Sequence, residues 1–211
     1  MTFSAAVLGA TGLVGRECVQ LLLGEPTFTR VTALSRRPMP PTSGDDKLQH
    51  AVIDFDDLDT SRDVFAASHV FCALGTTIKQ AGSQERFREV DLGYPAHAAE
   101  LALVAGARHF LLVSSLGASA DARTFYLRVK GELEQRIIKL GFRSVTIVRP
   151  SLLLGDRAEF RLGEQVASRF AWAFPRKYRA VHVRDVARAL VGAAVEDRAG
   201  VRVMENAEIL A

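Results

Sequence analysis

Short apolar runs alternate with longer segments of helical periodicity along most of this chain. The apolar run Ala5–Gly9, for example, leads directly into Leu13–Leu23, whose apolar residues recur at helical spacing. Continuous apolar strands joined by helices are typical of a parallel sheet that helices cover on both faces. We therefore predict an α/β fold built on a doubly wound parallel sheet. Further strands are expected at Val31–Leu34, Ala51–Ile53, Val70–Leu74, Phe110–Val113, Val145–Val148 and Val201–Met204, and further helices at Asp57–Ala67, Asp91–Ala105 and Phe125–Lys139.

The alternation becomes weaker after Pro150. We expect residues 1–211 to form a single domain in which about 151–211 contribute a small, partial C-terminal substrate lobe. The proline-containing stretch Pro38–Lys47 is expected to be a surface loop rather than a domain linker. Four large aromatic residues are expected to pack inside the lobe, and the alternative is that some of them line a substrate pocket. They are Phe160, Phe170, Trp172 and Phe174.

Two aspartates stand where helices are expected to begin. Asp91 opens a long helical segment that has Pro95 in its first turn, where a backbone N–H has no intrahelical partner in any case. Asp185 follows the strand-like run Val181–Val183 and precedes a second helical segment. An aspartate carboxylate can accept a hydrogen bond from the free amides of a first turn. We therefore expect Asp91 and Asp185 to be N-caps.

The composition excludes several classes of function. The 27 basic and 24 acidic residues leave a net charge of +3, and no basic stripe indicates a nucleic-acid partner. No apolar run approaches the roughly 18 residues of a membrane helix, and the first residues do not resemble a signal peptide. Cys18 and Cys72 lie in apolar periodic segments and are expected to be buried, reduced thiols, so a cytoplasmic location is expected.

Neither a metal site nor a hydrolase triad is expected. No pair of histidines has the close spacing of metal ligands, and no cysteine lies at ligand distance from one of them. Each histidine is expected at a strand end or on a helix surface. No Gly-x-Ser-x-Gly segment surrounds a serine to form a nucleophile turn. The histidines are His50, His69, His97, His109 and His182.

The segment Gly9-Ala10-Thr11-Gly12-Leu13-Val14-Gly15 joins the first strand to the first helix. Gly9 can form a tight turn, Gly12 allows a pyrophosphate to approach the backbone, and Gly15 allows the helix to pack on the strand. The free amides and the dipole at a helix N-terminus attract phosphate. This context predicts a Rossmann dinucleotide-binding turn, and the alternative is a glycine-rich turn without a ligand. The residues expected to contact the diphosphate are Gly9, Thr11, Gly12, Leu13, Val14 and Gly15.

The end of the second strand indicates which dinucleotide is bound. NAD-selective folds usually place a carboxylate there to meet the adenosine ribose, but this strand continues into Ser35, Arg36 and Arg37. A hydroxyl and two guanidinium groups suit a 2′-phosphate, so NADP(H) is the expected cofactor. The alternative is that both arginines are solvated loop charges. Further along, Leu74-Gly75-Thr76 closes the fourth strand, where Gly75 would let the backbone pass close to the nicotinamide-side ribose.

Tyr126 and Lys130 form a Tyr-x-x-x-Lys pair on one face of a predicted helix. A neighbouring ammonium stabilises the phenolate form of a tyrosine, which suits a general acid/base, and the same lysine could hold ribose hydroxyls. Upstream of the pair the fifth strand ends in Ser114-Ser115, where one hydroxyl could bind a substrate carbonyl. Because side chains alternate along a strand, only one of these serines is expected to face the cofactor. The alternative is an ordinary Tyr/Lys pair on a helix surface.

The glycine spacing of Gly9–Gly15 resembles the cofactor turn of the atypical and extended short-chain dehydrogenase/reductases. The order Ser-Ser followed by Tyr-x-x-x-Lys also resembles that superfamily, and the likeness covers nearly the whole chain. Several segments resemble, more narrowly, its Tat-interacting-protein group, which includes a tumour-suppressor oxidoreductase and bacterial relatives. These segments are Cys72–Thr77, Phe87–Asp91, Ser114–Ala118 and Phe125–Glu132.

The resemblance implies roles for further residues. Tyr126 and Lys130 match the acid/base and its partner, and Ser115 matches the carbonyl-binding serine, with Ser114 as its rival. Asp54, which Phe55 follows, resembles the acid that meets the adenine amino group, although a solvated turn aspartate is the alternative. Val148-Arg149-Pro150-Ser151 resembles the turn beside the nicotinamide, with Ser151 where many relatives have glycine.

Two functions follow from these patterns. The first is an NADP(H)-dependent oxidoreductase that transfers hydride to or from a small carbonyl or quinone. The second is a non-catalytic, NADP(H)-sensing regulatory protein that recruits a protein partner. The Ser–Tyr–Lys set favours the enzyme, whereas the short lobe after Pro150 favours the sensor. The oligomeric state stays open.

Overall fold

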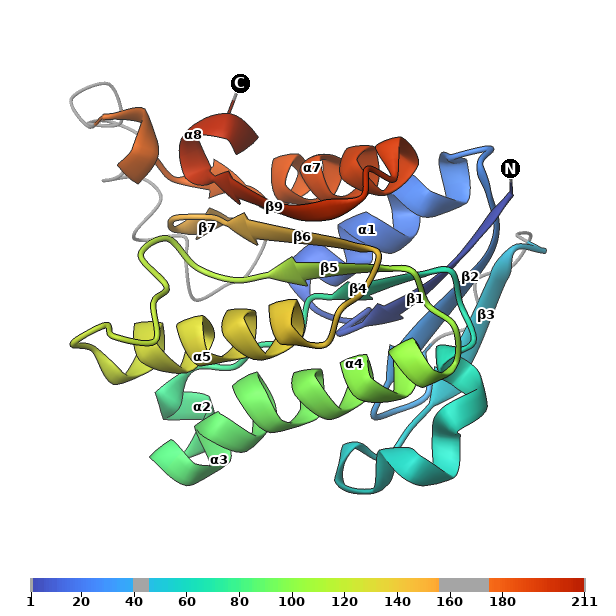
Figure 1. The fold of residues 1–211 in the computed structure, drawn as a ribbon, viewed down its shortest axis with the longest axis horizontal. Helices are drawn as coiled ribbons and strands as arrows, with labels where there is room; N and C mark the ends of the chain where they lie inside the picture. Colours follow the sequence, from blue (N-terminus) through green and yellow to red (C-terminus); the bar gives the residue numbers. More distant parts are fainter. Residues whose placement is uncertain (1, 40–45, 156–174, 211) are drawn as a thin grey trace.

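The computed structural model describes residues 2–39, 46–155 and 175–210. Its centre is a parallel sheet of seven strands in the order β3-β2-β1-β4-β5-β6-β9. The first six positions follow the strand order of dinucleotide-binding sheets, in which the order of the strands reverses between β1 and β4. The predicted doubly wound parallel sheet is therefore confirmed (Figure 1).

The predicted strands and helices lie within a few residues of those observed. The sheet strands are β1 (Phe3–Leu8), β2 (Phe28–Ser35), β3 (Leu48–Val52), β4 (His69–Cys72), β5 (His109–Val113), β6 (Ser144–Arg149) and β9 (Gly200–Glu205). The longer helices are α1 (Leu13–Gly24), α4 (Tyr94–Val104), α5 (Phe125–Lys139) and α7 (Val183–Glu196). Shorter elements are η1 (Phe55–Phe65), α2 (Ile78–Ala81), α3 (Gln84–Arg88), η2 (Glu89–Gly93), β7 (Leu153–Leu154), η4 (Arg176–Tyr178), β8 (Val181–His182) and α8 (Asn206–Ile209).

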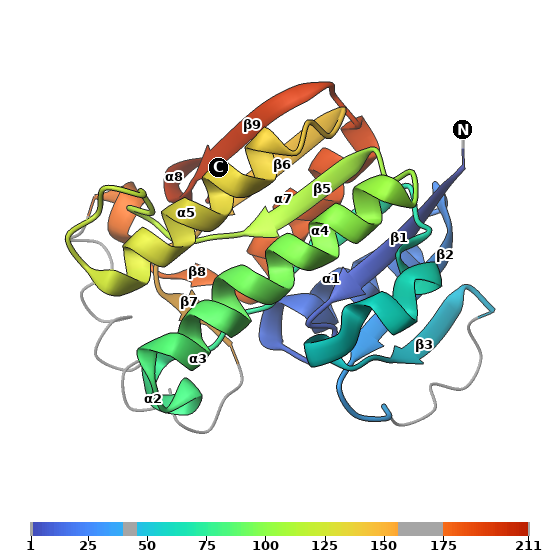
Figure 2. The same cartoon turned by 60° about the horizontal axis from the view of Figure 1, so that its bottom comes forward.

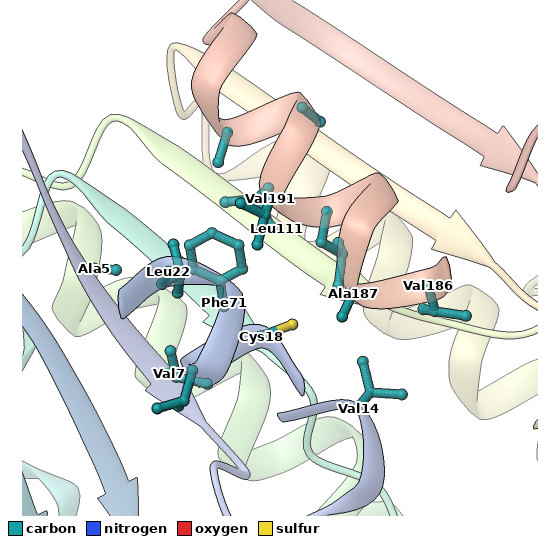
Figure 3. Packing of buried hydrophobic residues seen from close by; sticks show 14 of the residues in the cluster. Ala5, Val7, Val14, Cys18, Leu22, Phe71, Leu111, Val186, Ala187 and Val191 are labelled. Atoms are coloured by element: carbon teal, nitrogen blue, oxygen red, sulfur yellow. The ribbon is translucent and has the colours of Figure 1, made fainter. Parts of the chain in front are cut away.

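Helices cover both faces of the sheet, as Figures 1 and 2 show. On one face α1 and α7 pack together, and on the other α4 lies between α5 and η1 and packs against both. Apolar side chains fill both interfaces, so the central strands β1, β4, β5 and β6 are buried on both faces and are rich in apolar residues. Figure 3 shows the first interface, which includes Ala5, Val7, Val14, Cys18, Leu22, Phe71, Leu111, Val186, Ala187 and Val191.

Both predicted aspartate N-caps are wrong. Asp91 lies inside a continuous helical stretch, because α3, the π-helical turn η2 and α4 follow one another without a break. Its buried carboxylate bonds to groups outside this helix, as described below. At α7 the N-cap is His182, whose Nδ1 accepts a hydrogen bond from the amide of Arg184, and Asp185 lies in the first turn.

The C-terminal residues complete the sheet rather than standing apart from it. β9 pairs with β6, and α7 covers the sheet beside α1. A two-stranded sheet of β7 and β8 lies near the carboxyl ends of the main strands (Figure 2). The four aromatic residues predicted to pack in a lobe, Phe160, Phe170, Trp172 and Phe174, lie outside the described residues. Within the described ranges, no helix has both the length and the apolar character that crossing a bilayer requires.

Candidate functional site

A cavity of about 470 Å³ opens at the carboxyl ends of the strands where the strand order reverses. This is where ligands bind in open α/β sheets. Nine of the residues predicted to bind a cofactor line it: Gly9, Thr11, Gly12, Ser35, Arg36, Phe55, Leu74, Gly75 and Thr76. The glycine turn, the end of β2 and the segment after β4 therefore meet around one space, as the sequence predicted.

The glycine turn leaves no room for side chains at two of its three glycines. Gly9 has a φ of +77°, and a Cβ there would lie 2.7 Å from the carbonyl oxygen of Ala73. A Cβ on Gly15 would lie 2.1 Å from the carbonyl oxygen of Gly9, so α1 can begin this close to β1 only with glycine. The N-cap of α1 is Gly12, and no side chain caps this end of the helix. Its first amides can therefore serve an anionic ligand.

The end of β2 carries the residues predicted to select NADP(H). Ser35 is buried, and its hydroxyl donates a hydrogen bond of 2.6 Å to the carbonyl oxygen of Arg37. Arg36 is exposed and lines the cavity, whereas Arg37 is exposed outside the lining. Within the described ranges neither guanidinium has an ion-pair partner within 4.0 Å. Arg36 is therefore the better placed of the two to meet a phosphate.

The segment after β3 approaches the same cavity. Phe55 lines it, whereas the carboxylate of Asp54 accepts a hydrogen bond of 2.9 Å from the amide of Asp56 and caps η1. Phe55 also packs against Tyr94, with ring centroids 5.4 Å apart. The structure thus places Phe55 against the space itself and gives Asp54 a local structural bond.

Two further lining residues, Arg86 and Tyr94, were missed from the sequence. The Tyr94 hydroxyl donates a hydrogen bond to Asp56, and the Arg86 guanidinium lies 5.5 Å from the centre of the Tyr94 ring. Burial, reinforced by that hydrogen bond, raises the pKa of Tyr94 to about 12. Tyr94 therefore stays protonated near neutral pH and suits binding better than proton transfer. Arg86 lies in the short polar helix α3 and Tyr94 is the first residue of α4, and no sequence motif marks either of them.

Lys130 is buried outside the lining of the cavity, next to Gly75, and pairs with Asp91. Its Nζ lies 2.7 Å from Oδ1 of Asp91, and Oδ2 of Asp91 accepts a hydrogen bond of 2.9 Å from the amide of Thr76. A Cβ on Gly75 would lie 3.7 Å from Nζ of Lys130. Burial alone would lower the pKa of Lys130, but the charges of Asp91 and Tyr126 raise it overall. Lys130 is therefore a cation held beside Gly75 and Thr76, which line the cavity.

Helix α5 presents Tyr126 and Lys130 on one face, as the sequence predicted. Tyr126 is half-buried and packs against Phe87 of α3, with ring centroids 5.7 Å apart. The loop after β5 crosses this helix at Gly131, where a Cβ would lie 2.1 Å from the carbonyl carbon of Ser119. This close crossing positions the loop that carries the predicted serines. Gly131 was also missed, because a single glycine inside a helix reveals nothing about what crosses it.

The two serines at the end of β5 have different surroundings. Ser114 is buried, and its hydroxyl donates a hydrogen bond to Glu134. Arg149 holds Glu134 through two hydrogen bonds of 3.0 and 2.6 Å and pairs with Glu205 at 2.9 Å. Ser115 is half-buried, and within the described part of the chain its hydroxyl makes no hydrogen bond to protein. Only the Ser115 hydroxyl is therefore left for a ligand.

The turn after β6 is joined to this loop and to α8. The carbonyl oxygen of Pro150 accepts a hydrogen bond of 2.9 Å from the amide of Leu116. The buried Asn206 side chain accepts a hydrogen bond of 2.8 Å from the Ser151 amide and donates one of 2.8 Å to the carbonyl oxygen of Arg179. The turn predicted to lie beside a nicotinamide is thus fixed on both sides. Leu13, Val14 and Gly15 in the first turn of α1, and Pro150 here, lie outside the lining of the cavity.

A protein-family model and individual relatives each match most of this chain. Residues 9–197 match a protein-family model described as NAD(P)H-binding. The chain is 37% identical over 213 residues to Protein HTATIP2 of Rattus norvegicus, covering 98% of this chain and 88% of that protein. It is 40% identical over 162 residues to Protein FMP52-1, mitochondrial, of Scheffersomyces stipitis, covering 73% of this chain and 69% of that protein.

Solved structures share the fold at lower identity. MoeE5, solved in complex with UDP-glucose and NAD, superimposes with a TM-score of 0.73 at 22% identity, covering 95% of this chain and 74% of that one. The Bordetella bronchiseptica enzyme WbmH, solved in complex with NAD+, gives a TM-score of 0.72 at 14% identity, with 97% and 76% covered. At these identities the likeness concerns the fold.

Proposed function

Because this chain belongs to the NAD(P)H-binding family and is related to HTATIP2, we propose that it is an NADP(H)-dependent oxidoreductase acting on a small carbonyl or quinone. The observation that carries the proposal is the place of Lys130, the lysine of the Tyr-x-x-x-Lys pair. Its buried ammonium is held by Asp91 beside Gly75 and Thr76, and these two residues line the cavity. A buried cation next to a half-buried tyrosine suits a site of proton transfer. An ordinary Tyr/Lys pair on a helix surface would instead have an exposed lysine.

The residues of the cavity fit a dinucleotide. The diphosphate would lie against Gly9, Thr11 and Gly12 at the uncapped N-terminus of α1, where amides and the helix dipole attract negative charge. The absence of a Cβ at Gly9 and Gly12 leaves the backbone accessible there. MoeE5 and WbmH, which share this fold, are solved with NAD and NAD+. Sheets of this kind bind the pyrophosphate at the first turn.

NADP(H) is proposed over NAD(H) because of the end of β2. Arg36 lines the cavity there, and β2 ends in Ser35 without a carboxylate that would meet a ribose 2′-hydroxyl. A guanidinium forms charge-assisted hydrogen bonds with phosphate. Arg86 adds a second cation to the lining, although Glu89 and Asp56 already partner it. We infer that Arg36 is the main contact of a 2′-phosphate.

The proposed roles of the chain's own groups follow from their surroundings. When bound, the nicotinamide supplies or accepts a hydride. Tyr126 gives a proton to the substrate oxygen in the reducing direction and takes it back in the other. Lys130 stabilises the phenolate that remains and holds ribose hydroxyls. Ser115 polarises the carbonyl, because the Ser114 hydroxyl already bonds to Glu134.

A second candidate is a non-catalytic protein that binds NADP(H) and signals its presence to a protein partner. The observation that favours this candidate is the arrangement of the described residues after Pro150. Both β9 and α7 add to the sheet and its helical cover rather than to a substrate lobe. In that case Tyr126 and Lys130 would only anchor the nicotinamide ribose.

The test combines binding and turnover. NADPH and NADH are titrated by fluorescence, and NADPH oxidation is then followed with a panel of quinones, aldehydes and ketones. We expect tighter binding of NADPH and reduction of at least one substrate class. Tighter binding of NADH would overturn the cofactor choice. NADPH binding without turnover of any substrate would favour the sensor.

We also propose that the protein is cytoplasmic, although the related FMP52 proteins of Scheffersomyces stipitis and Candida albicans are named mitochondrial. The proposal rests on two buried free thiols, Cys18 and Cys72, which suit a reducing compartment. Fractionation of the source cells, with antibody detection of the protein, tests this.

A further inference from the structure

Two histidines and an aspartate meet at the amino-terminal edge of the sheet, the edge opposite the cavity. His69 begins β4 and His109 begins β5, and the two residues pair in the register of these strands. Asp197 follows α7 in a left-handed backbone conformation, with a φ of 43°. Both imidazoles are almost fully buried, at 0% and 1% exposure. The histidines are far apart in sequence, so close spacing could not reveal this cluster.

Three atoms of the cluster converge without a hydrogen-bond partner. Oδ1 of Asp197 lies 3.5 Å from Nε2 of His69 and 3.4 Å from Nδ1 of His109. All three atoms lie within 4.8 Å of one another, and none makes a hydrogen bond. Two ligands on a tetrahedral zinc ion are separated by about 3.3 Å, given the usual bond lengths of about 2.0–2.1 Å. The observed separations from Asp197 are close to that value.

The hydrogen bonds on the far side of each group orient it toward this point. Nδ1 of His69 lies 2.9 Å from the Ser68 hydroxyl, which itself donates to the carbonyl oxygen of Ser4. The Ser68 hydroxyl can accept a hydrogen bond from Nδ1 of His69, and in that tautomer Nε2 carries a lone pair on the side of Asp197. Nε2 of His109 lies 2.9 Å from the Thr146 hydroxyl. Such outer hydrogen bonds are typical of metal-binding histidines.

Some of the charges around the cluster oppose the binding of a cation, and others favour it. Arg143 donates a hydrogen bond of 2.9 Å to Oδ2 of Asp197, and Arg108 lies 3.2 Å from the same oxygen. Both guanidiniums weaken the attraction for a cation, but they contact Oδ2 and leave Oδ1 of Asp197 free. The C-terminus of α7 places the negative end of its dipole at Asp197, which favours a cation.

We propose that His69, His109 and Asp197 bind one divalent transition-metal ion of the Zn²⁺ type. Two imidazoles and a carboxylate are ligands that zinc accepts, with a water molecule in the fourth position. Such an ion would join β4 and β5 to the end of α7 and would stabilise the fold. The ion can enter beside Asp197, whose side chain is 12% exposed. The site is separate from the cavity, so its occupancy is not expected to change NADPH affinity.

The test uses the full chain without an affinity tag, after treatment with a chelator. Zn²⁺ is titrated by calorimetry, Co²⁺ by visible absorption, and the melting temperature is measured with and without Zn²⁺. We expect one ion per chain, a tetrahedral Co²⁺ spectrum and a higher melting temperature with Zn²⁺. Asp197→Asn and His109→Asn should lower the affinity at least tenfold. His50→Gln, which changes an exposed histidine on β3, should leave it unchanged.

A fourth variant keeps the test decisive if the ligand variants fail to fold. Thr146→Ala removes the outer hydrogen bond of His109 and no ligand, and it should weaken binding roughly 10–100-fold. The proposal is overturned if the native chain binds no Zn²⁺. It is also overturned if Thr146→Ala and every folded ligand variant bind like the native chain, because the ion would then be adventitious.

Discussion

The ammonium of Lys130 lies 2.7 Å from the carboxylate of Asp91, and both side chains are buried, at 5% and 0% exposure. The pair joins α5 to the helical turn η2, and through the amide of Thr76 it joins both to the segment after β4. Lys130 therefore cannot move away from Gly75 without removing the ion-pair partner of the Asp91 carboxylate. Asp91 is a positioning residue for the Tyr-x-x-x-Lys pair.

Asp91→Ala should be strongly destabilising. Removing one partner of a buried ion pair leaves the other charge uncompensated and costs roughly 3–5 kcal/mol. Chemical denaturation of the variant, compared with the native chain, measures this loss. The double variant Asp91→Leu with Lys130→Met, which removes both charges, should recover much of it. If the double variant is as unstable as the sum of the two single variants, the pair does not act as a unit.

Asp91 also shows which features of the fold the sequence could not predict. The periodic strands and helices were found to within a few residues, because burial on both sheet faces imposes long apolar runs. The segment that contains α2, α3 and η2 has no such periodicity, and an aspartate at its end suggested an N-cap. The partners of Asp91 come from α5 and from the segment after β4, and local sequence patterns carry no record of contacts between distant segments.

The sequence likewise predicted only part of the candidate site. Gly9, Gly12 and Gly15 stand at a turn whose spacing follows from backbone geometry, so the sequence revealed them directly. Arg86 and Tyr94 reach the cavity from α3 and α4, and no motif marks them. The choice between Ser114 and Ser115 depended on Glu134, which lies one helix further along the chain. Residues that are selected by tertiary contacts became visible only in the fold.

Gly12→Val should abolish dinucleotide binding while the fold persists. The added methyl groups would occupy the place of the diphosphate, whereas a Cβ on Gly12 would lie 3.1 Å from the carbonyl oxygen of Gly9 and 4.0 Å from that of Ala73. Fluorescence titration with NADPH and circular dichroism measure the two properties. Gly15→Val is the contrasting variant and should unfold the chain, because its Cβ would lie 2.1 Å from the Gly9 carbonyl oxygen. Normal NADPH binding by Gly12→Val would show that the diphosphate lies elsewhere.

Replacing Arg36 and Arg37 together by alanine should weaken NADPH binding about tenfold or more and leave NADH nearly unaffected. Each charge-assisted bond to phosphate contributes roughly 1.5–3 kcal/mol. Arg36→Ala alone should account for most of the loss, since Arg36 lines the cavity and Arg37 does not. Arg62→Ala removes an exposed arginine of η1, 67% exposed, and serves as the control. Equal weakening of both dinucleotides would exclude a 2′-phosphate contact.

Tyr126→Phe should reduce turnover by about 10²–10⁴-fold, the usual contribution of general acid catalysis, without weakening NADPH binding. The ring and its packing on Phe87 remain, so the fold should be intact. Steady-state kinetics on any substrate found in the panel, together with NADPH titration, test this. Tyr178→Phe changes an exposed tyrosine of η4 and should have no effect. Unchanged activity of Tyr126→Phe would mean that another group transfers the proton.

Ser115→Ala and Ser114→Ala should affect different properties. Ser115→Ala removes the proposed donor to the substrate carbonyl, and the loss of one such donor typically costs about 10²–10³ in turnover. Ser114→Ala removes a hydrogen bond to the buried Glu134, so it should lower the free energy of unfolding by roughly 1–3 kcal/mol and leave turnover largely intact.

Kinetics and denaturation on the same two serine variants separate these roles. Glu134 keeps its two hydrogen bonds to Arg149 in Ser114→Ala, so the fold should survive the change. If Ser114→Ala loses turnover and Ser115→Ala loses only stability, the assignments are reversed, and β5 must present its other face to the cofactor. If neither variant loses turnover, the carbonyl is polarised by a group outside β5, and the proposed Ser–Tyr–Lys arrangement is reduced to Tyr126 and Lys130.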